Sequence, residues 1–125
     1  MNELTVEDLL EEIVEHDPRY NIEAYSFIRE GLDYTVNKLN KPRHVSATEL
    51  LDGIKGYALQ EFGPVSKRVL FEWGITSCED IGNIVFNLVD IGLLGKTNED
   101  RIENFQNGYD LQEALVEPFL PEKVR

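Results

Sequence analysis

Three short segments of the sequence pair a residue that can cap a helix with an acidic residue three positions later. These segments are Thr5 to Asp8, Ser46 to Glu49 and Thr76 to Glu79. In such a capping box the first side chain accepts a hydrogen bond from the fourth backbone N–H, and the acid accepts one from the first. Apolar residues at helical spacing follow each segment, as expected for an amphipathic helix. The chain is therefore predicted to be mainly helical.

The same signals predict where the helices lie. We expect about five helices, over residues 6–16, 22–39, 47–62, 65–73 and 77–91, with breaks at Asp17-Pro18, at "NKPRH" and at Gly63, Gly74 and Gly92. Pro64 suits the first turn of the fourth helix. Gly53 and Gly56 lie one turn apart in the third helix, and the absence of side chains there predicts the close approach of another helix.

The segment after Gly92 is less regular. Asn107-Gly108 is a turn signal flanked by Phe105 and Tyr109, which leaves a short C-terminal β-hairpin and an irregular acidic loop both open. "DLQEALVEPF" is expected to add a helical turn or two, and residues 119–125 to form a loose tail. The interpretation is a single compact helical domain over residues 1–125, with a winged-helix-like arrangement among its open alternatives.

Composition excludes several classes of site. Cys78 is the only cysteine, so no internal disulfide can form, and only His16 and His44 are available to a zinc ion. No apolar run reaches the roughly 18 residues of a membrane span, and the acidic N-terminal segment does not resemble a secretory signal. We therefore expect a cytoplasmic protein with no membrane association, no bound metal and no cofactor.

Charge is distributed unevenly along the chain, whose net charge is −12. Residues 1–33 hold ten acids and two bases (−8), residues 34–75 four acids and six bases (+2), and residues 76–125 ten acids and four bases (−6). Because nucleic-acid binding depends on Lys and Arg releasing counterions from phosphates, this balance disfavours a nucleic-acid partner. A partner protein with a basic surface fits the charge better.

The fourth and fifth predicted helices, joined at Gly74, have the outline of a helix-turn-helix. The polar face of the fifth helix carries the wrong groups for DNA, since it would offer mostly carboxylates to the major groove. Its polar residues are Glu79, Asp80, Asn83, Asn87 and Asp90. Only Lys67 and Arg68, in the fourth helix, suit phosphate contacts. The outer face of the fifth helix, with Asp80, is instead a candidate surface for a basic partner.

No catalytic constellation is visible in the sequence. Glu12 and His16 share a helix face, but a di-iron bundle needs such pairs from two helices. Cys78 stands at a predicted helix N-terminus, which lowers a thiol pKa, yet Glu79 and Asp80 oppose that effect. No catalytic residue is therefore assigned, and the Glu12–His16 face is interpreted as solvated.

Two groups of residues remain as candidate binding residues. The first is the basic loop with Lys41, Arg43 and His44, which could dock an acidic peptide or an anion or could simply be solvated. The second is aromatic, with Tyr25 near Arg19, and with Trp73 elsewhere in the sequence. Trp73 closes a predicted helix, a position that favours a core residue over a binding residue.

Several short motifs resemble a small bacterial family of conserved hypothetical proteins described as restricted to planctomycetes and verrucomicrobia. The motifs are Asp17-Pro18-Arg19-Tyr20, Ala24-Tyr25-x-Phe27, His44-Val45-Ser46-x-x-Glu49-Leu50-Leu51, Phe62-Gly63, Trp73-Gly74, Asp80-x-Gly82-x-Ile84-Val85-Phe86 and Tyr109-Asp110. They extend over nearly the whole chain. Ile81 stands where an aromatic residue is expected. The resemblance implies a bacterial cytoplasmic protein, and it implies no activity and no catalytic residue.

The function that the sequence favours is a non-enzymatic protein-interaction or adaptor domain. Two alternatives stay open: a winged-helix-like DNA-associated transcriptional regulator, and an enzyme with an unrecognised site. Self-association is a further hypothesis, because Phe86 and Ile91 lie away from the main apolar stripe of the fifth helix and could join two copies.

Overall fold

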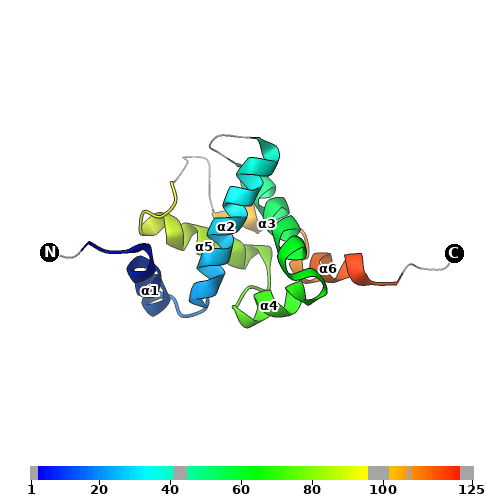
Figure 1. The fold of residues 1–125 in the computed structure, drawn as a ribbon, viewed down its shortest axis with the longest axis horizontal. Helices are drawn as coiled ribbons and strands as arrows, with labels where there is room; N and C mark the ends of the chain where they lie inside the picture. Colours follow the sequence, from blue (N-terminus) through cyan, green and yellow to red (C-terminus); the bar gives the residue numbers. More distant parts are fainter. Residues whose placement is uncertain (1–2, 41–44, 96–101, 107, 122–125) are drawn as a thin grey trace.

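The computed structural model describes residues 3–40, 45–95, 102–106 and 108–121, and they form one compact helical domain (Figure 1). Its α-helices are α1 (Val6–His16), α2 (Ile22–Leu39), α3 (Ala47–Phe62), α4 (Ser66–Glu72), α5 (Cys78–Asp90) and α6 (Leu111–Val116). Short 3-10 turns are η1 (Gly63–Val65), η2 (Ile102–Phe105) and η3 (Glu117–Phe119). The described residues include no strand. The predicted mainly helical fold is thus confirmed.

The C-terminal third differs from a hairpin wherever it is described. Residues around the proposed turn form η2 and then α6, the expected helical turns of "DLQEALVEPF". Residues 96–101 and 107 lie outside the described residues, so the hairpin stays untested there. The predicted tail begins at Phe119, the last residue of η3.

Two of the three capping boxes lie where the sequence predicts them. Thr5 caps α1 with Asp8, and Ser46 caps α3 with Glu49, each with both hydrogen bonds made. The third box is displaced by one residue.

Helix α5 is capped by Ser77 with Asp80 rather than by Thr76 with Glu79. Thr76 instead donates both its N–H and its hydroxyl to Asp80 Oδ2, at 2.9 and 3.0 Å. The carboxylate of Asp80 is thus the acceptor around which the start of α5 is built.

The fourth helix is shorter than predicted. Pro64 lies in the turn η1, and α4 begins at Ser66. The Ser66 side chain is buried, and its hydroxyl lies 2.9 Å from the carbonyl oxygen of Ala58 and 2.6 Å from that of Gly63. These contacts fix the angle at which α4 leaves α3.

The most extensive helix contact joins α2 and α3. A Cβ added at Gly53 would overlap the buried Thr35 side chain, so the predicted close approach is confirmed there. Gly56 makes only ordinary contact, with Tyr34. The two helices supply much of the apolar core, including Tyr25, Phe27, Ile28, Leu50, Leu51, Ile54 and Ala58.

Helix α5 runs through the middle of the domain, in contact with α2, α3 and η2. Leu88 is fully buried on it, and a Cβ at Gly82 would collide with Phe105 of η2. Phe86 also meets Phe105 edge to face, with ring centroids 6.2 Å apart. Phe86 and Ile91, the residues of the predicted dimer contact, are partly buried and pack against the core.

Candidate functional site

Two turns that are distant in sequence lie against each other. Residues 17–21 connect α1 to α2, and residues 73–77 connect α4 to α5. The Asn21 N–H donates to the Trp73 carbonyl oxygen at 3.0 Å. Gly74 has φ +97°, and a Cβ there would collide with the Arg19 carbonyl oxygen. Only glycine fits this contact, because it needs both a left-handed backbone and no side chain.

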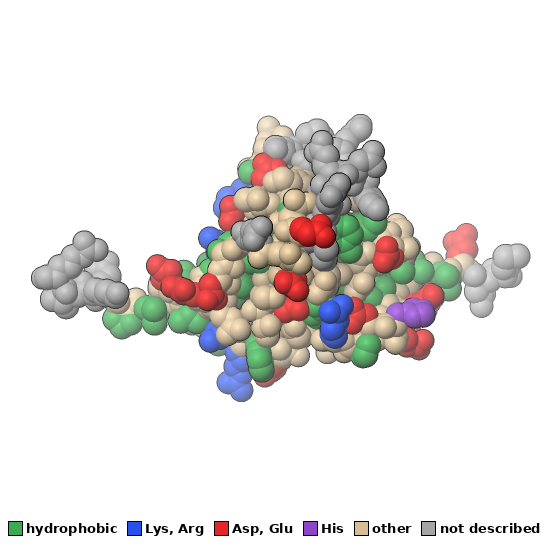
Figure 2. Space-filling model, turned by 180° about the vertical axis from the view of Figure 1, so that it is seen from behind, with side chains coloured by type: hydrophobic (Ala, Val, Ile, Leu, Met, Phe, Trp, Pro, Cys, Tyr) green, Lys and Arg blue, Asp and Glu red, His purple; other side chains and the backbone are tan. Residues whose placement is uncertain are grey.

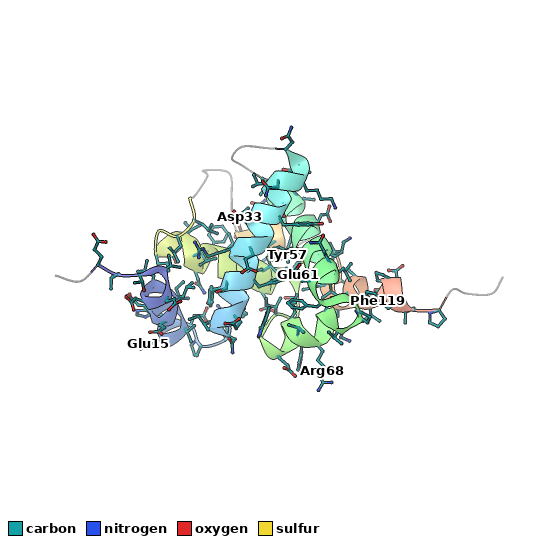
Figure 3. All side chains as sticks on the ribbon, viewed as in Figure 1. Glu15, Asp33, Tyr57, Glu61, Arg68 and Phe119 are labelled. Atoms are coloured by element: carbon teal, nitrogen blue, oxygen red, sulfur yellow. The ribbon has the colours of Figure 1, made fainter. Side chains whose placement is uncertain are left out.

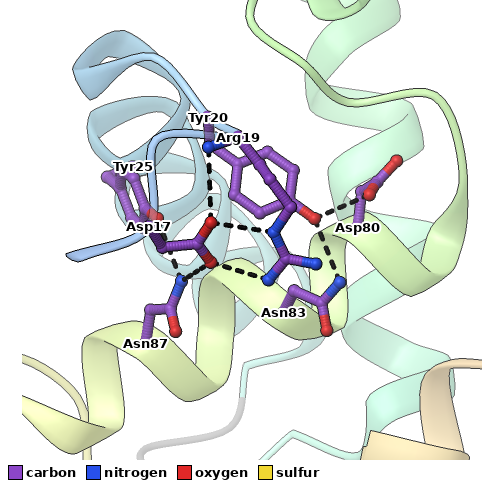
Figure 4. A network of polar contacts seen from close by, with 7 residues as sticks. All are labelled: Asp17, Arg19, Tyr20, Tyr25, Asp80, Asn83 and Asn87. Atoms are coloured by element: carbon purple, nitrogen blue, oxygen red, sulfur yellow. Dashed lines mark hydrogen bonds and ion pairs between the residues drawn. The ribbon is translucent and has the colours of Figure 1, made fainter. Parts of the chain in front are cut away.

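A set of polar residues links the first of these turns and the start of α2 to α5 (Figure 4). We call it the turn network, and its members are Asp17, Arg19, Tyr20, Tyr25, Asp80, Asn83 and Asn87. It brings together three of the predicted binding residues, Arg19, Tyr25 and Asp80.

One end of the turn network is the ion pair of Asp17 and Arg19. The guanidinium donates from Nε to Asp17 Oδ1 at 2.8 Å and from Nη2 to Oδ2 at 2.6 Å. These bonds hold the pKa of Asp17 well below its usual range. The Arg19 side chain is 60% exposed, whereas that of Asp17 is 16% exposed. Arg19 therefore covers a carboxylate that is itself largely enclosed.

Helix α5 joins this pair through Asn87. Its amide Nδ2 donates to Asp17 Oδ2 at 2.9 Å and lies 3.0 Å from the Tyr25 hydroxyl. Tyr25 is fully buried, and burial raises the pKa of its phenol. Asn87 thus satisfies the hydroxyl of a core aromatic residue.

The other end is centred on Tyr20 and Asp80. The buried Tyr20 donates its hydroxyl to Asp80 Oδ1 at 2.6 Å and accepts from Asn83 Nδ2 at 3.0 Å. Burial raises the pKa of Tyr20, and its bond to Asp80 raises it further. For Asp80, burial alone would raise the pKa, but hydrogen bonds from Tyr20, Thr76 and the start of α5 outweigh it and lower the pKa.

The hydrogen bonds of the turn network are made within the chain. No buried side-chain nitrogen or oxygen among the described residues lacks a hydrogen-bond partner. Buried polar groups paired in this way hold elements in a fixed arrangement. The sequence prediction missed Asn83 and Asn87. Their i, i+4 spacing beside the apolar stripe of α5 was the available signal, but it does not reveal a partner.

The other predicted binding residues lie elsewhere. The Trp73 ring lies 5.6 Å from those of Phe27 and Phe62, centroid to centroid, which makes it part of the core edge. Lys41, Arg43 and His44 lie outside the described residues.

Cys78 is buried, and its sulfur lies 3.3 Å from the Tyr109 carbonyl oxygen. Burial raises the pKa of its thiol, so the thiolate needed for a nucleophile is disfavoured. Across the described ranges, no group of three or more His, Cys, Asp or Glu side chains is placed to hold a metal ion.

The surface between α4 and α6 contains a groove. Two adjoining hollows share Lys67 and Gln112, and their volumes are about 380 Å³ and about 10 Å³. We call them the α4–α6 groove, because α4 supplies Lys67 and Phe71 whereas α6 and the residues beside it supply most of the rest. Those residues are Asp110, Leu111, Gln112, Glu113, Leu115, Val116 and Leu120.

Apolar side chains are exposed along this groove. Phe71 is 62% exposed and Leu120 57% exposed, while the buried Leu111 and Leu115 line the smaller hollow beside Phe71. In Figure 2, hydrophobic side chains extend along the arm that leads to the C-terminal end, with carboxylates above them and Lys and Arg side chains below. Figure 3 places Phe119 on this arm and Arg68 on the outer side of α4.

The two walls of the groove differ in charge. Lys67 stands on the α4 wall, and Asp110 and Glu113 stand on the α6 wall. None of the three forms an ion pair with another described residue. Arg68, the neighbour of Lys67, forms an ion pair within α4, with its Nε 3.6 Å from Glu72 Oε1. The groove thus has separate basic and acidic edges.

Comparison with protein-family models, with curated proteins and with solved structures finds no match to this chain. Among the described residues, no helix has the length and apolar character needed to cross a membrane.

Proposed function

We propose that the protein is a non-enzymatic protein-interaction domain that binds its partner through the α4–α6 groove. The observation that carries this proposal is Phe71, an aromatic side chain that is 62% exposed beside the buried Leu111 and Leu115. Exposed aromatic residues beside an apolar hollow are the usual anchors of protein interfaces.

Buried residues of α4 and a hydrogen bond from α6 hold the walls of the groove in place. Leu70, next to Phe71, is fully buried, and so is Ser66 at the start of α4. Across the groove, the Gln112 amide lies 3.4 Å from the Thr76 carbonyl oxygen. A surface held in this way binds with a smaller entropic cost than a mobile one.

Helix α5 does not favour the alternative of a DNA-binding regulator. A recognition helix must present polar side chains to base edges, but Asp80, Asn83 and Asn87 are engaged with the turn that precedes α2. The exposed polar residues left on α5 include Glu79 and Asp90, which are acids. An interaction with protein is the better account of this arrangement.

The turn network does not favour an enzyme either. A general acid or base works best with a pKa near the working pH. Asp17 and Asp80 have lowered pKa values, and Tyr20 has a raised one. Each group is thereby held in one protonation state near neutral pH, as in a structural network.

The nature of the partner is part of the proposal. A partner with a basic surface suits the acidic α6 wall of the groove, where Asp110 and Glu113 lie. The groove, with both signs of charge, also accepts a partner that carries both. A cytoplasmic location and membership of the bacterial family suggested by the sequence motifs are proposed with it.

The proposal can be tested by comparing partners captured by three forms of the full chain: the wild type, Phe71→Ser and Leu4→Ser. Leu4 is 68% exposed, so its variant removes an equally exposed apolar side chain far from the groove. We expect one or more proteins, an untagged copy of this chain included, to be lost from Phe71→Ser and retained by Leu4→Ser in quantitative mass spectrometry. Identical protein sets for all three forms would contradict the proposal.

A further inference from the structure

We propose that the occupant of the α4–α6 groove is a second copy of this chain, with α4 of each copy packed against α6 and η3 of the other across a two-fold axis. This inference rests on the proposed function, because it names the partner of the same groove. It follows from a property of the groove itself, which is that its two walls complement each other.

The charges of the two walls are complementary. Lys67 on α4 is a cation, and Glu113 on α6 is an anion, and neither is paired with a described residue of its own chain. In a two-fold dimer, if residue i contacts residue j of the other copy, then j also contacts i. One such contact therefore forms two ion pairs, Lys67 of each copy with Glu113 of the other.

The apolar groups of the walls are complementary in the same way. Phe71 stands out from α4, and the larger hollow of about 380 Å³ has Val116 and Leu120 on its other side. The exposed aromatic side chain of one copy can enter the open hollow of the other, which Val116 and Leu120 line together with four polar side chains, so each copy can both give and receive an anchor. An aromatic side chain buries about 150–250 Å² when it is enclosed, so two Phe71 anchors would form the centre of the contact.

The position of the groove also reduces repulsion between two chains of net charge −12. The acidic helix α1 lies at the opposite end of the molecule from α6 (Figure 1). Its exposed acids are Glu7, Asp8, Glu11, Glu12 and Glu15. In a dimer through the groove these two acidic ends point away from each other, beyond the roughly 8–10 Å over which charges interact at physiological salt.

The first test is the molar mass of the full chain, measured by light scattering over a concentration series. We expect the wild type to shift from monomer toward dimer as concentration rises, and Leu4→Ser to behave as the wild type does. Phe71→Ser should raise the dimer dissociation constant by at least about tenfold, the usual effect of removing an interface anchor. A wild type that stays monomeric throughout would overturn this inference.

The second test exchanges the charges. Lys67→Glu alone places two glutamates opposite each other at both contacts of the dimer, and Glu113→Lys alone places two lysines there. Each single variant should therefore dimerise at least about tenfold more weakly than the wild type. Lys38→Glu, with the same change of charge at the far end of α2, is the matched control and should leave the dissociation constant unchanged.

Mixing Lys67→Glu with Glu113→Lys then separates a contact between copies from one within a chain. At one contact of the mixed dimer, the glutamate introduced at position 67 of the first variant meets the lysine introduced at position 113 of the second. At the other contact, the native Lys67 meets the native Glu113. We expect a heterodimer to form with the wild-type dissociation constant. Absence of this rescue, while circular dichroism shows both variants folded, would overturn the proposed pairing of α4 with α6.

These results are distinguishable from failure of the proposed function. If the wild type is monomeric but Phe71→Ser loses a different captured protein, the second copy is excluded and the interaction surface stands. If the wild type dimerises and neither Phe71→Ser nor Lys67→Glu affects it, the dimer uses another face and the inference is wrong. If the wild type is monomeric and all forms capture the same proteins, both proposals are wrong.

Discussion

The turn network and the α4–α6 groove use their polar and apolar residues in opposite ways. In the turn network every described buried side-chain nitrogen and oxygen has a partner, and the carboxylates of Asp17 and Asp80 each accept several hydrogen bonds. In the groove, Phe71 and Leu120 are exposed and Lys67 has no ion pair among the described residues. The first region holds the helices together, whereas the second leaves contacts unmade.

This difference teaches that a charged or aromatic residue is not a binding residue by virtue of its type. Arg19, Tyr25 and Asp80 have the side chains expected of a site, yet their hydrogen bonds are made within the chain. Phe71 belongs to an ordinary amphipathic helix, and its side chain remains exposed to solvent after folding. Exposure after folding, rather than chemistry alone, distinguishes the two regions.

The largest effect on stability should follow from Gly74→Ala, which disrupts the contact between the two turns. The added Cβ meets the Arg19 carbonyl oxygen at a residue whose φ is +97°. We expect the free energy of unfolding, measured in urea, to fall by about 4 kcal/mol, because strain and a backbone clash add. Gly92→Ala is the control, with φ +82° and open space around the added Cβ. Its cost should be only the left-handed strain of about 1–2 kcal/mol, and equal losses would contradict the turn contact.

A smaller effect should follow from Asp80→Asn, which keeps the shape of the turn network and removes a charge. An amide cannot accept all the bonds that Tyr20, Thr76 and Ser77 donate, so we expect a loss of about 2 kcal/mol at pH 7. Asp33→Asn, at an exposed site on α2 (Figure 3), should change the free energy of unfolding by less than about 0.5 kcal/mol.

The same variant tests the protonation state of Asp80. Its folded pKa is lowered, so its contribution is present above the unfolded pKa of about 3.9 and is lost as pH falls through the folded value. Between about pH 5 and pH 2, the free energy of unfolding of the wild type should therefore fall more steeply than that of Asp80→Asn. Part of the slope should remain, because the pKa of Asp17 is also lowered. Parallel curves would show that Asp80 is not held ionised by the network.

The smallest effect on stability should come from the groove. Phe71 is 62% exposed, so Phe71→Ser should change the free energy of unfolding of the monomer by less than about 0.5 kcal/mol. Chemical denaturation at low protein concentration would measure this, with Leu4→Ser alongside. A loss above about 1 kcal/mol would place Phe71 in the core and would remove the contrast between the two regions.

Much of the secondary structure follows from local signals. Ser46 and Glu49 lie three residues apart, and the capping box that they form depends only on that spacing. The bounds of α2 likewise follow from its apolar stripe and from the segment that breaks it. The predicted cap of α5 was wrong by one residue, because Thr76 and Ser77 both suit an N-cap. The hydrogen bond from the Tyr20 hydroxyl to Asp80 favours Ser77, which caps the helix together with Asp80.

The candidate sites depend on distant residues, and for that reason the sequence predicted only fragments of them. Tyr20 and Asp80 are 60 residues apart, and Asp17 and Asn87 are 70 apart, so no spacing rule connects them. The groove joins Lys67 and Phe71 to residues from position 110 onward in the same manner.

By itself, then, the sequence determined the helical class, most of the helix bounds and the uneven charge, because capping, periodicity and composition act over a few residues. Only the tertiary structure decided that Asp80 faces Tyr20 inside the domain and that Phe71 faces solvent. Burial depends on which helices pack together, and that packing is a property of the whole chain rather than of any segment.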